Sequence, residues 1–283
     1  MGEATRLPMT LVWKKHMKIH HIRNATFVIA SGENHILIDP MLSRKGELPP
    51  FAYFRHKSRR NPLVPLPDNA PAILDQVTHC LITHSQKWGI KALQHTDHLD
   101  DAGASFLLKK NVPVLTRRQD ASHLKKMGFN VVAALAYWQP TPLLGGEITA
   151  IPAQHGHRWI HAQMANGAGY YLKLPGEPSI YISGDTVYTP DVDRVLTEFK
   201  PNIAVMAAGR ASLDIGGPIL MPMEELRTFV QKAPAKVIAN HLEALNHCPT
   251  TRSQLQQALL HNGLLSKVSI PSDGETLTFE NRR

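Results

Sequence analysis

The segment THSQKWGIKALQHTDHLDD, from Thr83 to Asp101, decides how the rest of the sequence is interpreted. Its second half gathers three side chains of types that bind metal ions, His95, Asp97 and His98, whereas His84 stands eleven residues before His95, at the end of an apolar run. Neutral imidazole is the commonest metal ligand in proteins. The segment therefore predicts a metal site and leaves open whether His84 belongs to it.

Composition indicates an ordinary globular chain of 283 residues, of which 43% are hydrophobic and 19% charged. Only two cysteines occur, so neither a disulfide framework nor a cysteine-based zinc cluster is expected. No apolar run reaches the length of a membrane span, and the first residues lack the pattern of a secretory signal. We therefore expect a cytoplasmic protein.

The formal net charge is +8, which makes acidic ligands, phosphorylated metabolites and nucleic acids worth considering as partners. The basic residues are spread along the chain, and only FRHKSRR, residues 54–60, forms a cluster. We interpret this cluster as a solvated loop. A single short cluster does not favour a nucleic-acid-binding protein.

The order of expected elements predicts one α/β domain over residues 1–283. After an extension at residues 1–16, the segment 17–40 predicts two strands joined by a turn at 31–34. Residues 43–72 hold six prolines and predict a long surface excursion. Strands then alternate with helices, which favours two packed sheets covered by helices. The expected helices are residues 100–110, 118–127, 192–199, 223–232 and 253–261.

Further candidate ligands each stand just beyond a predicted strand: His84, His155, Asp185 and His241. Loops at strand ends let a rigid scaffold bring distant side chains together, so we expect them to meet the 95–98 cluster. The combined set offers five imidazoles and two carboxylates, enough for two adjacent metal ions if one carboxylate bridges them. Zinc accepts these donors, and paired metals activate water for hydrolysis.

With these motifs the sequence resembles a known family. HTDHLD, AQHGH, SGDT and NHLEA occur in the order found in the metallo-β-lactamase superfamily, whose pattern is HxHxDH followed by a distant His, an Asp and a last His. HILIDP near the start is similar to the family's early strand. The resemblance covers residues 17–279 and implies an αββα sandwich of two mixed sheets flanked by helices. GGPILM and NHLEALNH resemble the branch of ascorbate-6-phosphate lactonase and N-acyl phosphatidylethanolamine phospholipase D.

The resemblance also implies a ligand set for two metal ions. The implied ligands of one ion are His84, His95 and His155, those of the other are Asp97, His98 and His241, and Asp185 bridges the two. Two zinc ions are expected, with manganese as an alternative, and a metal-bridged hydroxide would cleave an ester, lactone, amide or phosphodiester bond. Asp97 is also implied to guide the hydroxide or to protonate the leaving group.

The sequence departs from the family pattern at its first histidine. In the family the first two histidines are two residues apart, but here Leu93 stands two residues before His95. His84 stands where the first histidine normally stands, which implies that QKWGIKALQ, residues 86–94, is an insertion within the motif. If the insertion removes His84 from the site, the protein binds only one metal ion. Trp88 either lines the pocket or packs the insertion, and we favour packing.

Other residues near these motifs have a structural interpretation beside a functional one. Asp39 either orients a metal-bound histidine or caps the turn before Pro40. Asp214 either contacts the substrate or forms a turn with the two glycines that follow it. Cys248 and His247 follow the last motif, and for Cys248 we favour structural packing.

The loop after His155 offers candidate substrate contacts. His157 and Arg158 are the residues we name there, because the guanidinium group of Arg158 would match an anionic substrate through two parallel hydrogen bonds. The alternative is that both are loop residues without a role in catalysis.

Three functional hypotheses follow. The first is a metal-dependent hydrolase acting on a small anionic molecule. The second is a nuclease or phosphodiesterase acting on nucleic acid, which predicts a basic stripe leading to the metal site and salt-sensitive RNA binding. The third is a non-catalytic metal-binding or sensor protein of the same fold. The sequence gives neither the substrate nor the oligomeric state.

Overall fold

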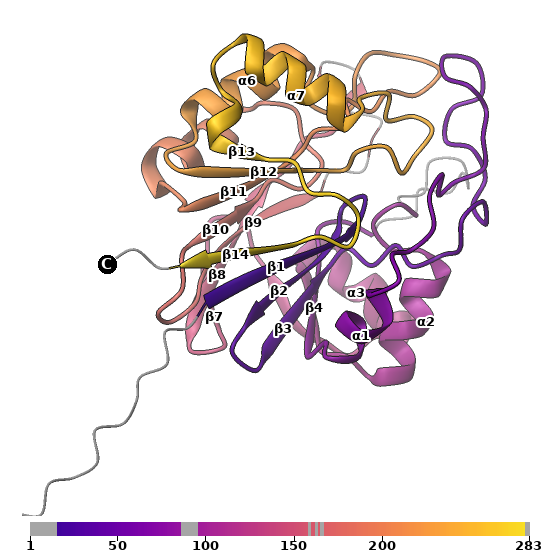
Figure 1. Ribbon diagram of the computed structural model, residues 1–283. Helices are drawn as coiled ribbons and strands as arrows, with labels where there is room; N and C mark the ends of the chain where they lie inside the picture. The colour runs from indigo at the N-terminus through magenta and orange to yellow at the C-terminus, as the bar shows by residue number, and fades with distance from the viewer. Residues whose placement is uncertain (1–15, 86–95, 158–159, 162–163, 165–166, 281–283) are drawn as a thin grey trace, which may run out of the picture.

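The computed structural model describes residues 16–85, 96–157, 160–161, 164 and 167–280. Its strands form two seven-stranded sheets, in the orders β14-β1-β2-β3-β4-β5-β6 and β13-β12-β11-β10-β9-β8-β7. The sheets lie face to face with helices outside them (Figure 1). Each sheet contains antiparallel and parallel pairs. The predicted fold of two mixed sheets flanked by helices is therefore confirmed.

The strands are short and lie in two groups along the chain. The first sheet contains β1 (His16–Arg23), β2 (Thr26–Ser31), β3 (Asn34–Ile38), β4 (His79–Ile82), β5 (Val114–Arg117), β6 (Val131–Leu135) and β14 (Thr276–Glu280). The second sheet contains β7 (Pro140–Leu143), β8 (Gly146–Pro152), β9 (Ala168–Lys173), β10 (Ile180–Ile182), β11 (Ile203–Ala207), β12 (Lys236–Asn240) and β13 (Val268–Ser269). The first sheet thus takes its last strand from the carboxyl-terminal end of the chain.

Alternating side chains in β2 show how the layers form. Phe27 and Ile29 lie in the core between the two sheets, whereas Val28 faces the helices that cover the first sheet. Successive side chains of a strand point to opposite faces, so one apolar strand supplies both layers. Burying such a side chain stabilises the fold by about 1.5–3 kcal/mol.

Two groups of helices complete the sandwich (Figure 1). The first sheet is covered by α1 (Ala70–Asp75), α2 (Asp101–Lys110) and α3 (Arg118–Lys126). The second is covered by α5 (Pro190–Arg194), the π-helix η2 (Val195–Phe199), α6 (Met223–Lys232) and α7 (Arg252–His261), and a short 3-10 helix, η3 (Leu265–Lys267), precedes β13. Among the helices of the described residues, none has both the length and the apolar character needed to cross a bilayer.

The amino-terminal segment differs from the prediction. Residues 17–40 were expected to form two strands, but they form β1, β2 and β3. The additional turn lies at Asn24, whose φ of 58° is in the left-handed region that asparagine tolerates better than most residues. The sign of this turn in the sequence is only the single Asn24 between Arg23 and Ala25.

The proline-rich excursion is attached to the end of the first sheet. Among the described residues, its one β-bridge is the isolated pair Leu48 and Asn61. The fully buried Arg23 donates hydrogen bonds to the carbonyl groups of Val64, Met41 and Ser43 over 2.9–3.0 Å. One guanidinium group thus fixes both ends of the excursion beside β1.

Asp273 connects β1 to α7, and this contact predicts a pH-dependent stability. Its carboxylate lies 3.4 Å from His21 Nε2 and 2.6 Å from Arg252 Nη2. Burial raises the pKa of Asp273, but His21 and Arg252 outweigh burial and lower the pKa below its ordinary value of 3.8. A lowered carboxylate pKa stabilises the fold above the unfolded-state pKa, and this contribution is lost as the pH falls through the folded-state pKa.

We therefore expect Asp273→Asn to lower the free energy of unfolding by about 1–2 kcal/mol at pH 7. The difference from wild type should shrink below about pH 4, where the wild-type carboxylate is also becoming protonated. Urea denaturation at pH 7 and at pH 3 measures both values. If wild type and Asp273→Asn differed in the free energy of unfolding by the same amount at both pH values, the stabilising role of the Asp273 carboxylate would be contradicted.

Candidate metal centre

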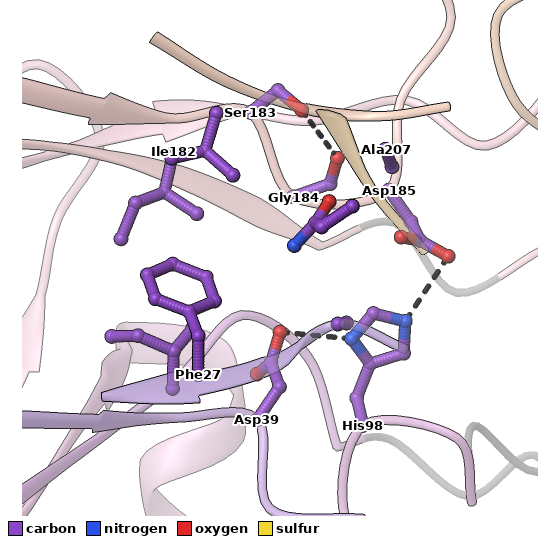
Figure 2. A pocket seen from close by; sticks show the side chains of 12 residues that line it. Phe27, Asp39, His98, Ile182, Ser183, Gly184, Asp185 and Ala207 are labelled. Carbon is purple, nitrogen blue, oxygen red and sulfur yellow. Dashed lines mark hydrogen bonds and ion pairs between the residues drawn. The ribbon is translucent and has the colours of Figure 1, made fainter. Parts of the chain in front are cut away.

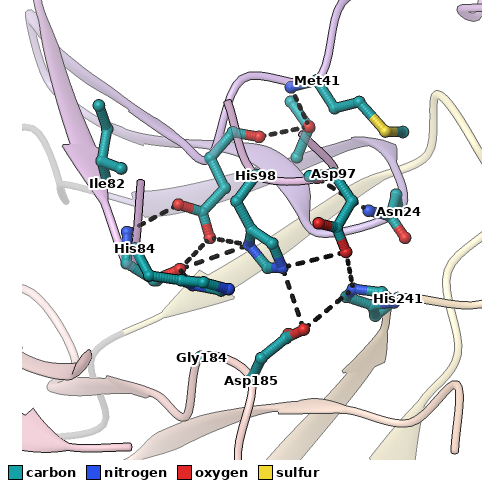
Figure 3. A network of polar contacts seen from close by, with 12 residues as sticks. Asn24, Met41, Ile82, His84, Asp97, His98, Gly184, Asp185 and His241 are labelled. Carbon is teal, nitrogen blue, oxygen red and sulfur yellow. Dashed lines mark hydrogen bonds and ion pairs between the residues drawn. The ribbon is translucent and has the colours of Figure 1, made fainter. Parts of the chain in front are cut away.

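Six of the seven predicted ligands lie within the described residues, and they meet where strands of the two sheets end. Figure 3 shows His84, Asp97, His98, Asp185 and His241. His84 follows β4, His155 follows β8, Asp185 follows β10 and His241 follows β12. Asp97 and His98 come from the turn before α2. The remaining predicted ligand, His95, lies outside the described residues, as does Trp88.

The six side chains form two overlapping groups. In each group the ligand atoms lie within 4.8 Å of one another, and every residue is buried. One group consists of Asp97, His98, Asp185 and His241, and the other of His84, His155 and Asp185. Asp185 belongs to both groups, so the arrangement has the form of two adjacent cation sites that share one carboxylate.

Asp185 lies at the centre of the cluster. Its Oδ2 atom is 3.1 Å from His98 Nε2, 3.5 Å from His241 Nε2 and 4.0 Å from His155 Nε2. Gly184 turns the chain immediately before it with a φ of 62°. A Cβ atom on Gly184 would lie 2.7 Å from the carbonyl oxygen of Ala168, so this approach requires glycine.

Asp39 fixes the orientation of His98. Its Oδ2 atom lies 2.8 Å from His98 Nδ1, and its two carboxylate oxygens accept hydrogen bonds from the amide and hydroxyl groups of Thr83, each over 2.7 Å. The ring of His98 therefore turns Nε2 towards Asp185, as Figures 2 and 3 show. Carboxylates in this position keep a histidine in the tautomer and direction that suit metal binding.

His84 is held by residues that lie outside the 86–94 segment. Its Nδ1 atom is 2.8 Å from the hydroxyl group of Thr83, and its Nε2 atom is 3.2 Å from His155 Nε2. The next residue, Ser85, donates its amide to the buried carboxylate of Asp120 over 2.9 Å. Contacts of Thr83 and of Asp120 in α3 thus help to position His84, and its imidazole faces His155.

Cys248 packs against the last histidine. Its sulfur lies 3.4 Å from His241 Nδ1 and 3.9 Å from His247 Nδ1. Burial raises the pKa of the Cys248 thiol, but the two histidines outweigh this effect and lower the pKa to about 7. Both Cys248 and the other cysteine, Cys80, are buried and free. Cys248 therefore packs against His241, one of the candidate ligands.

The charges of the cluster reinforce one another. Burial raises the pKa of Asp185, but His98 and His241 outweigh burial and hold that pKa well below its ordinary value. Burial lowers the pKa of His98, and the carboxylates of Asp185, Asp97 and Asp39 reverse this and raise it. The carboxylate of Asp185 is therefore ionised at neutral pH and presents negative charge to a cation.

Apolar side chains line a small cavity next to the cluster. This cavity between the sheets is lined by Phe27, Ile182 and Ala207 as well as by His98 and Asp185 (Figure 2). Apolar walls exclude water and strengthen electrostatic interactions at the site.

Three buried atoms test whether the cluster fits a metal ion. His98 Nε2, His241 Nε2 and Asp185 Oδ1 make no hydrogen bond within the described residues, although both nitrogens lie within ion-pair distance of Asp185 Oδ2. Buried polar atoms are normally hydrogen-bonded, so three such atoms without a hydrogen bond in one cluster need another explanation. Nitrogen and carboxylate oxygen donors at this spacing suit a divalent metal ion such as zinc.

The predicted substrate contacts lie apart from the cluster or outside the described residues. His157 is exposed, and its Nε2 atom lies 2.6 Å from Glu225 Oε1. Arg158 lies outside the described residues. Asp214 accepts hydrogen bonds from the amides of residues 53–55 over 2.8–3.0 Å, which fastens the tip of the excursion to the loop before α6.

Sequence reasoning missed several residues that support the cluster. Thr83 and Asp120 hold the chain on either side of His84, and Asn24 contacts both Asp97 and His241. Thr83 could have been noticed as the hydroxyl residue before a candidate ligand. Asp120 and Asn24 carry no such signal, because their partners lie far away in the sequence.

Comparison with known proteins gives consistent results. Residues 34–241 match the family model described as the Beta-lactamase superfamily domain. The UPF0173 protein YddR of Bacillus subtilis is 33% identical over 93% of this chain and 100% of that protein. A UPF0173 metal-dependent hydrolase of Pyrococcus furiosus is 27% identical over 92% of this chain and 99% of that protein.

Two solved structures are similar over nearly the whole chain. The isothiocyanate hydrolase from Delia radicum gut bacteria has a TM-score of 0.82 at 32% identity, covering 94% of this chain and 100% of that one. A possible metal-dependent hydrolase from Veillonella parvula has a TM-score of 0.80 at 27% identity, covering 93% and 99%.

Proposed function

Since this chain belongs to the β-lactamase superfamily and is a metal-dependent hydrolase of the metallo-β-lactamase fold, we propose that it works with two adjacent metal ions. The observation that carries the proposal is the pair of buried donor groups that share Asp185. His84 and His155, with His95, complete one site, and Asp97, His98 and His241 complete the other.

Asp39 and Asp97 have different proposed roles in hydrolysis. The metal ions, when bound, would activate a water molecule and stabilise the negative charge that develops on the substrate. Asp39 holds His98 in a fixed orientation. Asp97 Oδ2 lies 3.5 Å from His241 Nε2 and 3.6 Å from His98 Nε2, and its proposed additional role is to guide the attacking hydroxide or to protonate the leaving group.

We propose zinc as the metal, because imidazole and carboxylate donors suit it, with manganese as the alternative. Plasma mass spectrometry of protein purified without chelators tests this. We expect about two metal ions per chain, as two donor groups require. Protein that binds no metal after reconstitution would leave the non-catalytic alternative.

The proposed substrates are small anionic esters, lactones, amides or phosphodiesters. The net charge of +8 and the exposed cations Arg55, Lys57 and Arg59 on the excursion favour an anionic molecule. A panel of p-nitrophenyl esters, aryl phosphodiesters and lactones, assayed with and without chelator, distinguishes the bond classes. Salt-sensitive RNA binding would favour the nuclease alternative instead.

Isothiocyanates are a second candidate substrate class. The supporting observation is the 32% identity to an isothiocyanate hydrolase across its full length. Water would add to the central carbon of the N=C=S group, and carbon–nitrogen cleavage would release an amine and carbonyl sulfide. Loss of benzyl isothiocyanate absorbance with release of benzylamine tests this, and a rate equal to the uncatalysed rate would exclude it.

Residues 1–283 are proposed to act as one domain in the cytoplasm. The two cysteines support this location, because they are buried and free, one in β4 and the other beside His241. Disulfides form and persist in oxidising compartments, whereas unpaired cysteines are usual in the cytoplasm.

A substitution at Gly167 tests the place of His84 without changing a ligand. A Cβ atom at Gly167 would lie 3.1 Å from Cβ, Cγ and Nδ1 of His84, so alanine there displaces the imidazole. We expect Gly167→Ala to weaken metal affinity by about 10- to 100-fold at one of the two sites, as displaced ligands do. Competition with a chelator measures the affinity.

Gly217→Ala is the matched control. Its added Cβ atom would lie 3.8 Å from its nearest neighbour, Ile160, which is an ordinary contact. Equal metal affinity of Gly167→Ala and Gly217→Ala would mean that His84 does not bind a metal ion.

A further inference from the structure

Asn24 contacts two of the proposed ligands from the turn between β1 and β2. Its side-chain nitrogen donates a hydrogen bond to the carbonyl oxygen of Asp97 over 3.1 Å (Figure 3). The main-chain carbonyl oxygen of Asn24 accepts a hydrogen bond from the main-chain amide of His241 over 2.9 Å. Asn24 is fully buried, so water does not compete for either bond.

The two ligands need such a support. His241 has a φ of 59°, a left-handed conformation that a residue other than glycine keeps only when its surroundings hold it. Asp97 lies in a turn directly after residues 86–95 rather than at the end of a strand. Its Oδ2 atom nevertheless lies 3.5 Å from His241 Nε2. The spacing of the two ligands therefore depends on contacts outside their own loops.

We infer that Asn24 is a positioning residue that holds Asp97 and His241 at the spacing of one metal site. The inference rests on the proposed function. The main-chain carbonyl of Asn24 fixes His241, and its side-chain amide fixes Asp97, so one residue sets the distance between ligands that are 144 positions apart in the sequence.

If Asn24 served only to form the turn, its backbone conformation would matter and its side-chain amide would not. Glycine adopts the left-handed region readily, so Asn24→Gly keeps the turn and the carbonyl that accepts from His241. Asn24→Asp keeps the size of the side chain, but its carboxylate cannot donate to the Asp97 carbonyl. These two variants separate the amide from the turn.

The control is a second asparagine in the same conformation. Asn111 has a φ of 49° at the carboxyl end of α2, where its carbonyl oxygen accepts a hydrogen bond from Asn130. Asn111→Gly makes the same chemical change as Asn24→Gly at a position with no hydrogen bond to any of the six proposed ligands in the described residues.

The experiment uses the full chain reconstituted with cobalt(II). Competition with a chelator gives the affinity of each ion, visible absorption reports the ligand geometry, and thermal melting without metal reports the fold. We expect Asn24→Gly and Asn24→Asp to bind one of the two ions about 10- to 100-fold more weakly, with a changed spectrum for that ion. Asn111→Gly should match wild type in affinity and spectrum.

Other outcomes separate this inference from the proposed function. Wild type that binds two cobalt ions, with Asn24 variants that melt earlier but keep its affinity and spectrum, would overturn the inference alone. Wild type that binds no cobalt would overturn the proposed function and the inference with it.

Discussion

Purified Asp185→Asn protein is expected to contain less than one metal ion per chain and to hydrolyse its substrate at least about 10³-fold more slowly than wild type. The reason is that both donor groups include this carboxylate, so its replacement weakens both sites at once. The asparagine keeps the shape of the side chain but loses the negative charge that lies 3.1 Å from His98 and 3.5 Å from His241. Plasma mass spectrometry and kcat/KM measure the two effects.

Asp191→Asn is the control for the loss of one carboxylate. Asp191 lies in α5, six residues after Asp185, and belongs to neither donor group. Its replacement should leave the metal content at the wild-type value. Two tightly bound ions in Asp185→Asn protein would show that Asp185 does not bridge the sites.

The cluster could be predicted because its residues follow local patterns. His155, Asp185 and His241 each stand after a short apolar run that forms a strand, so their convergence at the strand ends follows from the layered fold. The sheets were predictable for the same reason, since alternating or continuous apolar residues mark β2, β9 and β11.

The residues that support the cluster could not be predicted in the same way. Asn24 lies 73 positions from Asp97, and Asp120 lies 35 positions from Ser85, so no local spacing links the partners. β6 and β7 were also missed. β7 has only four residues, two of them proline, and so lacks the composition of a core strand, whereas β6 is wholly apolar but has only one buried position.

His84 gives the second large expected effect. We expect His84→Ala to lower the metal content from about two ions per chain towards one, because a site that loses one of its few imidazole ligands releases its ion. The structure favours this result: His84 Nε2 lies 3.2 Å from His155 Nε2, and contacts of Thr83 and of Ser85 with Asp120 hold this part of the chain. His79→Ala, which removes a histidine of β4, the strand that precedes His84, and lies outside both donor groups, is the control.

The outcome decides how the insertion acts on the site. If the metal content falls only in His84→Ala protein, the insertion lengthens the motif between two ligands without removing either. If wild type and His84→Ala protein each bind one ion, the insertion has dismantled the first site, and His84 and His155 face each other without a metal ion between them. A single-metal protein would retain Asp97, His98, Asp185 and His241, so Asp185→Asn would still lower its activity, whereas His84→Ala would leave the activity unchanged.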